Sequence, residues 1–109
     1  MKNVIRGIDD LIYTLQIEDD SGTEVLLSDF DDFTISLFTA DITSAIDVTE
    51  YLDSEENLLR VPSQQLTNLV DGIVRMKVTV ALTDSEFPDQ TFDQSRITDT
   101  CYFLKTYTA

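Results

Sequence analysis

The segment 74–82 alternates strictly between apolar residues and polar or small ones, and this pattern constrains the fold more than any other feature. Because successive side chains of a β-strand point to opposite faces, the alternation predicts a strand with one buried face and one solvated face. The residues expected in the core are Val74, Met76, Val78, Val80 and Leu82. Arg75 and Lys77 are expected on the solvated face.

A period of two also runs through much of the remaining chain. It is present in Leu11–Ile17, at Val25 and Leu27, in Phe33–Thr39, and from Ile46 through Val48 to Tyr51-Leu52. Residues 97–107 are rich in threonine and aromatic residues, but Cys101–Leu104 are apolar on both faces, so the pattern does not assign the inward face. Short strands at this spacing are typical of an all-β domain.

Residues 63–70 are the one segment with helical spacing. Ser63 is the expected N-cap, and Gly72 is expected in the left-handed position after the last turn. The apolar residues at helical spacing are Leu66, Leu69 and Val70. The alternative makes Asp71-Gly72 the tight turn of a hairpin. We favour the short helix, because a strand would place Leu66 and Leu69 on opposite faces.

These elements predict an all-β fold, an Ig-like antiparallel β-sandwich of seven or eight short strands with one short helical turn near residues 63–70. Helices do not alternate with the strands, which argues against a parallel β-α-β arrangement. One apolar face per strand suits two packed sheets, and a small barrel is the alternative. A chain of 109 residues supports one domain. We expect an arm or strand lead-in over residues 1–7 and a single sandwich over residues 8–109.

The composition argues against several classes of function. With 21 acidic residues against 7 basic ones the formal charge is −14, which opposes binding to nucleic-acid phosphates or anionic lipid. The absence of His removes the usual general base and the commonest zinc ligand, and one Cys cannot form an internal disulfide or a Cys₄ site. No apolar run has membrane-spanning length. We expect no enzymatic activity, no cofactor, no nucleic-acid partner and no membrane partner.

Acidic clusters are the only dense polar groups. They are Asp19-Asp20, the segment 29–32, Glu55-Glu56 and the segment 84–89. Their spacing does not match a twelve-residue calcium loop. We interpret them as solvated loop charge that discourages edge pairing, and a weak divalent-ion site is the alternative. No metal ligand is assigned.

Two candidate catalytic groups lack the residues that they would need as partners. A pair of carboxylates could serve a glycosidase, but the chain has no Trp for a sugar platform. Cys101 could be a nucleophile, but no His is present to activate it. Its Tyr and Phe neighbours predict that Cys101 packs as a small buried hydrophobe.

The few basic residues mark candidate partner contacts. Lys2 and Arg6 flank the apolar Val4 and Ile5, and Arg75 and Lys77 share one strand face. These charges either serve solubility and cross-strand pairing, or they dock an acidic partner or an identical subunit. Phe38 is expected on the solvated side, where it would add an aromatic contact. The candidate contacts are Lys2, Val4, Ile5, Arg6, Phe38, Arg75 and Lys77.

The first seven residues have two interpretations that the pattern leaves open. As a docking arm, they would add a strand to the sheet edge of a partner. Alternatively, Val4 and Ile5 simply begin the first strand of their own sandwich.

The order of segments carries a resemblance. It begins with the lead-in Val4–Gly7, an acidic turn with Gly22 and the strand Phe33–Thr39, and it continues with Leu59–Pro62, Leu66, Leu69, Asp71-Gly72, the long strand and the loop Phe87–Asp89. This order resembles the small Ig-like domains of tailed-bacteriophage virion proteins, such as baseplate upper proteins, head fibres and capsid decoration proteins. The resemblance covers most of the chain as a pattern and implies no catalytic residues.

The resemblance implies a non-enzymatic structural protein of a tailed-phage virion, acting as capsid decoration, head fibre or tail adaptor. Such a protein would dock to other virion structural proteins, and also to itself if it forms a homo-oligomer. It would be assembled in the host cytoplasm and reside in the virion. The alternative is a free-standing carbohydrate- or calcium-binding β-sandwich module, whose ligand site would lie in the acidic loops.

Overall fold

The computed structural model describes residues 2–18, 22–30, 32–84 and 87–106, with the backbone alone for 82–84 and 87–94. These residues form eight strands in chain order: β1 (Lys2–Ile5), β2 (Leu11–Thr14), β3 (Asp32–Phe38), β4 (Ile46–Asp47), β5 (Leu52–Asp53), β6 (Leu58–Val61), β7 (Gly72–Asp84) and β8 (Phe87–Lys105). Four 3₁₀ helices lie between them: η1 (Leu27–Asp29), η2 (Ile42–Ser44), η3 (Thr49–Tyr51) and η4 (Gln65–Asn68). None of the described helices is long and apolar enough to cross a membrane.

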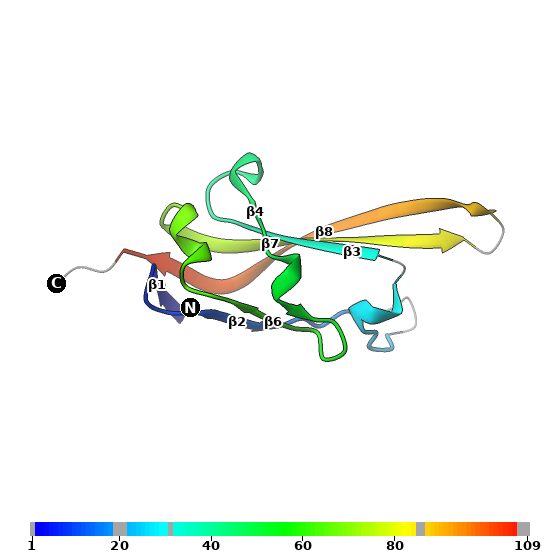
Figure 1. Cartoon of the computed structure of the whole chain (residues 1–109), viewed down its shortest axis with the longest axis horizontal. Helices are drawn as coiled ribbons and strands as arrows, with labels where there is room; N and C mark the ends of the chain where they lie inside the picture. Colours follow the sequence, from blue (N-terminus) through cyan, green and yellow to red (C-terminus); the bar gives the residue numbers. More distant parts are fainter. Residues whose placement is uncertain (1, 19–21, 31, 85–86, 107–109) are drawn as a thin grey trace.

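The strands pack as two sheets (Figure 1). One sheet has five strands in the order β1-β8-β7-β3-β4, and the other has three in the order β2-β6-β5. Neighbours are antiparallel except β1, which runs parallel to β8. This neighbour order matches strands G-F-C-C′ and B-E-D of immunoglobulin domains. The predicted all-β, Ig-like sandwich is therefore confirmed, although β7 and β8, with 13 and 19 residues, are long rather than short.

The core lies between the two sheets. Val74 and Met76 are buried, as the alternation predicts, and Val78 and Val80 are partly buried against the same cluster. Arg75 is exposed and Lys77 is partly buried, while the side chain of Leu82 lies outside the described part. The facing positions of β3 follow the register, since Ile35 is opposite Val78 and Leu37 is opposite Met76. The fully buried residues of the other sheet include Leu11, Leu59 and Val61.

The predicted helical turn near residues 63–70 is present as η4, but its ends differ from the prediction. The N-cap is Gln64, not Ser63, and no side chain caps it. The backbone N–H of Ser63 is instead bound by the carboxylate of Asp10 at 2.8 Å, which ties the turn to the start of β2. Gly72 does not close the helix, because it is already the first residue of β7. The rival hairpin is also wrong, since β6 and β7 lie in different sheets.

The end of β8 resolves the face that the sequence left open. Thr100 and Leu104 are buried and Tyr102 packs against the core, whereas Cys101 is exposed. The register explains this, because Asp99 pairs with Arg75 and Tyr102 with Val74, so Thr100 and Cys101 form a bulge. Cys101 has φ 62°, and its N–H is bound by the Asp99 carboxylate at 2.7 Å. The prediction of a buried Cys101 is therefore wrong, because the bulge turns its side chain outward.

The β7–β8 hairpin extends beyond the rest of the molecule (Figure 1). Within the described ranges, the pairing of β3 with β7 ends at Ala81, and residues 82–84 pair only with the facing part of β8. The principal extents are 58 × 26 × 20 Å, and the radius of gyration is 15.2 Å. A compact chain of this length would have a radius of gyration of about 13 Å. The far end of the hairpin therefore adds to the length of the molecule.

Candidate functional site

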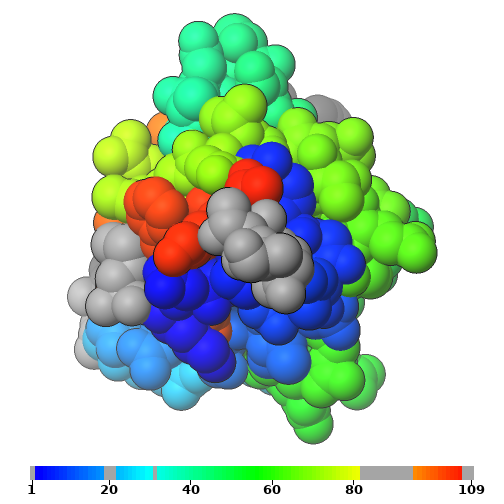
Figure 2. All heavy atoms as spheres, turned by 90° about the vertical axis from the view of Figure 1, so that its left-hand side faces the viewer, coloured from blue at the N-terminus to red at the C-terminus, as the bar shows by residue number. Residues whose placement is uncertain are grey.

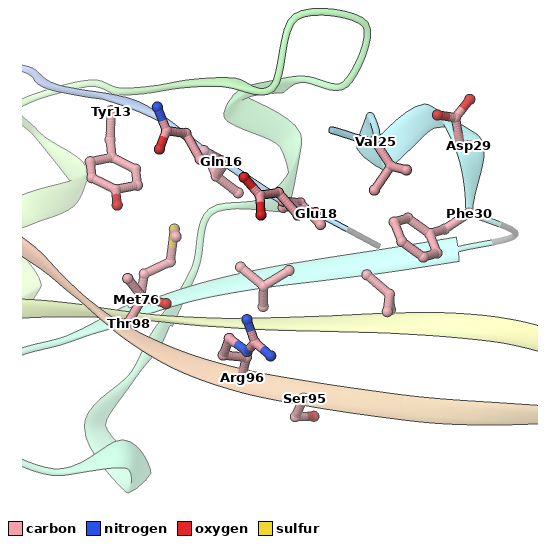
Figure 3. A pocket seen from close by; sticks show the side chains of 14 residues that line it. Tyr13, Gln16, Glu18, Val25, Asp29, Phe30, Met76, Ser95, Arg96 and Thr98 are labelled. Atoms are coloured by element: carbon pink, nitrogen blue, oxygen red, sulfur yellow. The ribbon is translucent and has the colours of Figure 1, made fainter. Parts of the chain in front are cut away.

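An open groove runs between the two sheets, along β2 and along the part of β8 that precedes its pairing with β1 (Figure 3). Its volume is about 600 Å³. One wall comes from β7 and β8, and the other from β2 and the segments that follow it. The apolar lining residues are Tyr13, Leu15, Ile17, Val25, Phe30, Met76, Val78 and Val80. Six of these eight are only partly buried, because the opposite sheet leaves them uncovered.

The rim of the groove is polar and carries charge of both signs. Glu18 and Asp29 stand on one wall, and Arg96 stands on the other (Figure 3). All three side chains are exposed. Arg96 faces the groove because its register partner is Val78, and paired residues share a face of the sheet. A partner bound at this site would therefore contact apolar side chains inside the groove and charged side chains at its rim.

Tyr102 lies next to Tyr13, one of the residues that line the groove. Its hydroxyl donates to the carbonyl oxygen of Ile12 at 2.6 Å, which joins the edges of the two sheets. The ring of Tyr13 stands edge-on to that of Tyr102, with centroids 6.5 Å apart. Burial raises the pKa of the Tyr13 phenol, and the nearby Cys101, Asp99 and Tyr102 raise it further. The phenol of Tyr13 therefore stays protonated to a higher pH than that of an ordinary tyrosine.

Asn57 holds the other wall of the groove in place. It is 1% exposed, and its side chain accepts from the N–H of Leu27 at 2.8 Å and donates to the carbonyl oxygen of Val25 at 2.9 Å. Its backbone adopts φ 52°, a conformation in which Asn is among the tolerated residues. These bonds anchor the segment that carries Val25, η1 and Phe30 to the loop before β6.

The candidate contacts near the N-terminus are engaged within the chain itself. Val4 is 2% exposed in β1, and β1 pairs with residues 102–105 of β8. The N–H of Ile5 is bound by the Asp9 carboxylate, and Lys2 lies 5.9 Å from the ring centroid of Tyr102. Residues 2–5 are thus a strand of this domain's own sheet, beside the last strand (Figure 2).

Arg6 is held by the same end of the molecule. It forms an ion pair with Asp71 and also reaches the hydroxyl of Thr106. The Asp71 carboxylate in turn accepts from the N–H and the hydroxyl of Thr106. These contacts fasten the residue after β1 to those just before β7 and just after β8, so Arg6 does not present a free charge.

Phe38, Arg75 and Lys77 lie on the outer face of the five-stranded sheet. The register places Phe38 opposite Arg75, on the face away from the inter-sheet core, but Phe38 is only 5% exposed. The expected exposed aromatic contact is therefore wrong. The connection from β3 to β4, which carries η2, lies on this side of the sheet (Figure 1). Arg75 remains exposed opposite Asp99.

The acidic residues do not gather into a metal site in the described part of the chain, where no group of three potential ligands occurs. The Asp29 carboxylate instead accepts from the N–H of Leu26 at 3.1 Å. Asp47 accepts from the hydroxyl and the N–H of Thr49 at 2.6 and 2.9 Å, and these bonds lower its pKa. Asp19, Asp20, Asp31 and Glu86 lie outside the described residues, as do the side chains of Asp84 and Asp89.

The sequence interpretation missed the groove. Among the charged residues of the groove, only Arg96 carries a sequence signal for it. The β7–β8 pairing places Arg96 beside the apolar face of β7. A single basic residue within an otherwise inward-facing register indicates incomplete cover by the other sheet. That signal can be interpreted only when the pairing of β7 with β8 is known.

Comparison of the chain with protein-family models, curated proteins and solved structures finds no match.

Proposed function

We propose that this chain is a non-enzymatic structural protein of a tailed-phage virion, acting as capsid decoration, head fibre or tail adaptor. It docks to other structural proteins of the particle, where it resides after assembly in the host cytoplasm. The proposal rests on the resemblance of its segment order to small Ig-like virion domains, together with a fold of that general kind.

The observation that carries the proposal is the hairpin that leaves the body of the domain. An isolated two-stranded ribbon is marginally stable in water, so a long one gains support from a surface to pack on. Beyond Ala81 the strands have only each other as partners among the described residues. A projecting ribbon suits a protein that is inserted between neighbours in an assembly.

The test uses particles purified by density gradient from the phage that encodes the chain. Quantitative mass spectrometry is expected to find the chain at a fixed copy number per particle. A shortened variant removes residues 82–92 and joins Ala81 to Asp93, which face each other across the hairpin, through an Asn-Gly turn. This variant is expected to melt close to wild type and to be lost from the particles.

Two results would contradict the proposal. One is the absence of the chain from purified particles. The other is a melting temperature that Ca²⁺ raises by many degrees and EDTA restores, or that an oligosaccharide raises and its removal restores. Either result would favour the ligand-binding module. Incorporation of the shortened variant at the wild-type copy number would remove the hairpin as the support for docking.

A further inference from the structure

The outer edge of β8 is occupied over only part of its length. β1 pairs with β8 at Tyr102–Lys105 and stops at the bulge formed by Thr100 and Cys101. Before the bulge, Ser95–Asp99 have only β7 as a neighbour among the described strands. Ser95, Arg96, Ile97 and Asp99 are exposed. At about 3.4 Å per residue, this stretch offers an edge on the order of 17 Å long.

The groove lies directly beside this open edge. Arg96 and Thr98 line it from β8, and their register partners Val78 and Met76 form its floor. A strand laid along β8 in line with β1 would cover the mouth of the groove. Its alternate side chains would point at the partly buried valines, and its backbone would pair with the free groups of the edge.

The charges around the site select the chemistry of that strand. Glu18 and Asp29 on the rim outnumber Arg96, and the whole chain carries a formal charge of −14. A second copy of the chain would bring the same excess of negative charge, so repulsion disfavours it. A segment that carries Lys or Arg beside its apolar residues would complement the net negative charge of the chain.

We propose that the groove and the edge at Ser95–Asp99 bind an extended strand of another polypeptide, with apolar and basic residues in alternation. This inference rests on the proposed docking function, since the strand would belong to another structural protein of the particle. A small apolar ligand would fill the groove but leave the adjacent backbone edge unpaired. The strand occupies both features at once.

The probe is a synthetic peptide, acetyl-Lys-Val-Thr-Ile-Lys-Val-Thr-Ile-Lys-amide, titrated into the ¹⁵N- and methyl-labelled protein. Chemical-shift changes are expected at the amides of residues 95–99 and at the methyl groups of Val78 and Val80. A peptide with Glu in place of each Lys is expected to bind at least about tenfold more weakly. A peptide methylated on alternate backbone nitrogens is expected to lose binding, because it cannot donate to the edge.

Two variants form a matched pair. Val80→Lys places a charged side chain on the groove wall, whereas Thr79→Lys places the same side chain next to it on the outer face. Both change the net charge equally. Val80→Lys is expected to weaken peptide binding by at least about tenfold, and Thr79→Lys by less than about threefold. Melting curves and amide spectra establish that both variants are folded.

Several outcomes would overturn the inference. These are an absence of shifts at any soluble peptide concentration, equal binding of the methylated peptide, or equal weakening by both lysine variants. A dimer that forms without peptide and is abolished by Val80→Lys would make a second copy the occupant. If the peptides fail while the chain is present in particles, the strand site is wrong and the proposed function stands. Peptide binding by a chain that is absent from particles would contradict the proposed function instead.

Discussion

The side-chain oxygen of Asn57 accepts a hydrogen bond from the N–H of Leu27 at 2.8 Å, although 30 residues separate them in sequence. Both residues are buried, so this amide satisfies a backbone group that water cannot reach. Through the same side chain, the carbonyl of Val25 is fixed as well. One polar residue in the core thereby positions the part of the groove wall that carries Val25 and η1.

Replacement of Asn57 with Ala is expected to lower the free energy of unfolding by about 2–4 kcal/mol. The change leaves the buried N–H of Leu27 and the partly buried carbonyl of Val25 without their partner, and it places Ala at a positive φ, so each effect is costly. Urea denaturation followed by circular dichroism measures the loss. The matched control is Asn68→Ala in η4, where the side chain is exposed and little change is expected. Equal effects at both positions would contradict the anchoring role of Asn57.

Introduction of a negative charge into β1 is expected to destabilise the fold strongly at one position and hardly at all at the next. Val4→Asp buries a carboxylate without a partner and is expected to cost about 3 kcal/mol or more. Asn3→Asp adds the same charge at an exposed position and is expected to change stability by less than about 0.5 kcal/mol. Thermal melts of the two variants compare them directly. A mild effect of Val4→Asp would mean that residues 2–5 are not an integral strand.

Truncations along β7 should follow the alternation of its faces. Met76→Ala is expected to cost about 2–4 kcal/mol and Val78→Ala about 1 kcal/mol, since Met76 is buried and Val78 borders the open groove. Lys77→Ala between them is expected to cost less than about 0.5 kcal/mol. Chemical denaturation gives all three values. If the three truncations prove equally mild, the assignment of the faces is wrong.

Asp47 predicts a specific response to acid. Its pKa lies below the ordinary value for an aspartate because the hydroxyl and the N–H of Thr49 both donate to the carboxylate. A folded-state pKa below the unfolded value means that the stabilisation is present above the unfolded pKa and is lost as the pH falls through the folded one. NMR titration of the Asp47 carboxyl carbon is expected to show the low pKa.

Two substitutions of Thr49 check this cause. Thr49→Val removes the hydroxyl donor and is expected to raise the pKa of Asp47 toward its ordinary value. Thr49→Ser keeps a hydroxyl and is expected to retain the low pKa. The hydroxyl of Thr49 also accepts from the N–H of Ile35 at 2.9 Å, so Thr49→Val should destabilise the fold at every pH. An unchanged Asp47 pKa in Thr49→Val would exclude the hydroxyl as its cause.

Much of the fold follows from local pattern, because the alternation at Val74 and Met76 already assigns a face and the strand count follows from the number and spacing of the alternating segments. The strand Leu58–Val61 and the bulge at Cys101 do not, because both depend on pairing with residues far away in sequence. Phe38 shows the same limit. Its face follows from the period of two, but its burial depends on segments outside the strand.

The groove was even less accessible to sequence reasoning. It arises where two sheets fail to cover each other, so it reflects the relative lengths and placement of strands rather than any motif. Arg96 carries a hint, but the hint has meaning only beside Val78. Lys2 and Arg6, which the sequence predicts as partner contacts, instead interact with Tyr102 and Asp71 within the chain.

The parallel pairing of Lys2–Ile5 with Tyr102–Lys105 also has a consequence during synthesis. During synthesis β1 leaves the ribosome well before β8, so it has to wait for β8 before it can pair. Until then Val4 has no core to enter, and the nascent chain carries an unpaired apolar strand. Contacts between such distant positions slow folding, since a large loop must close before they contribute. Closure of the sandwich at this edge therefore waits until β8 has left the ribosome, and a holding chaperone would be most useful before that point.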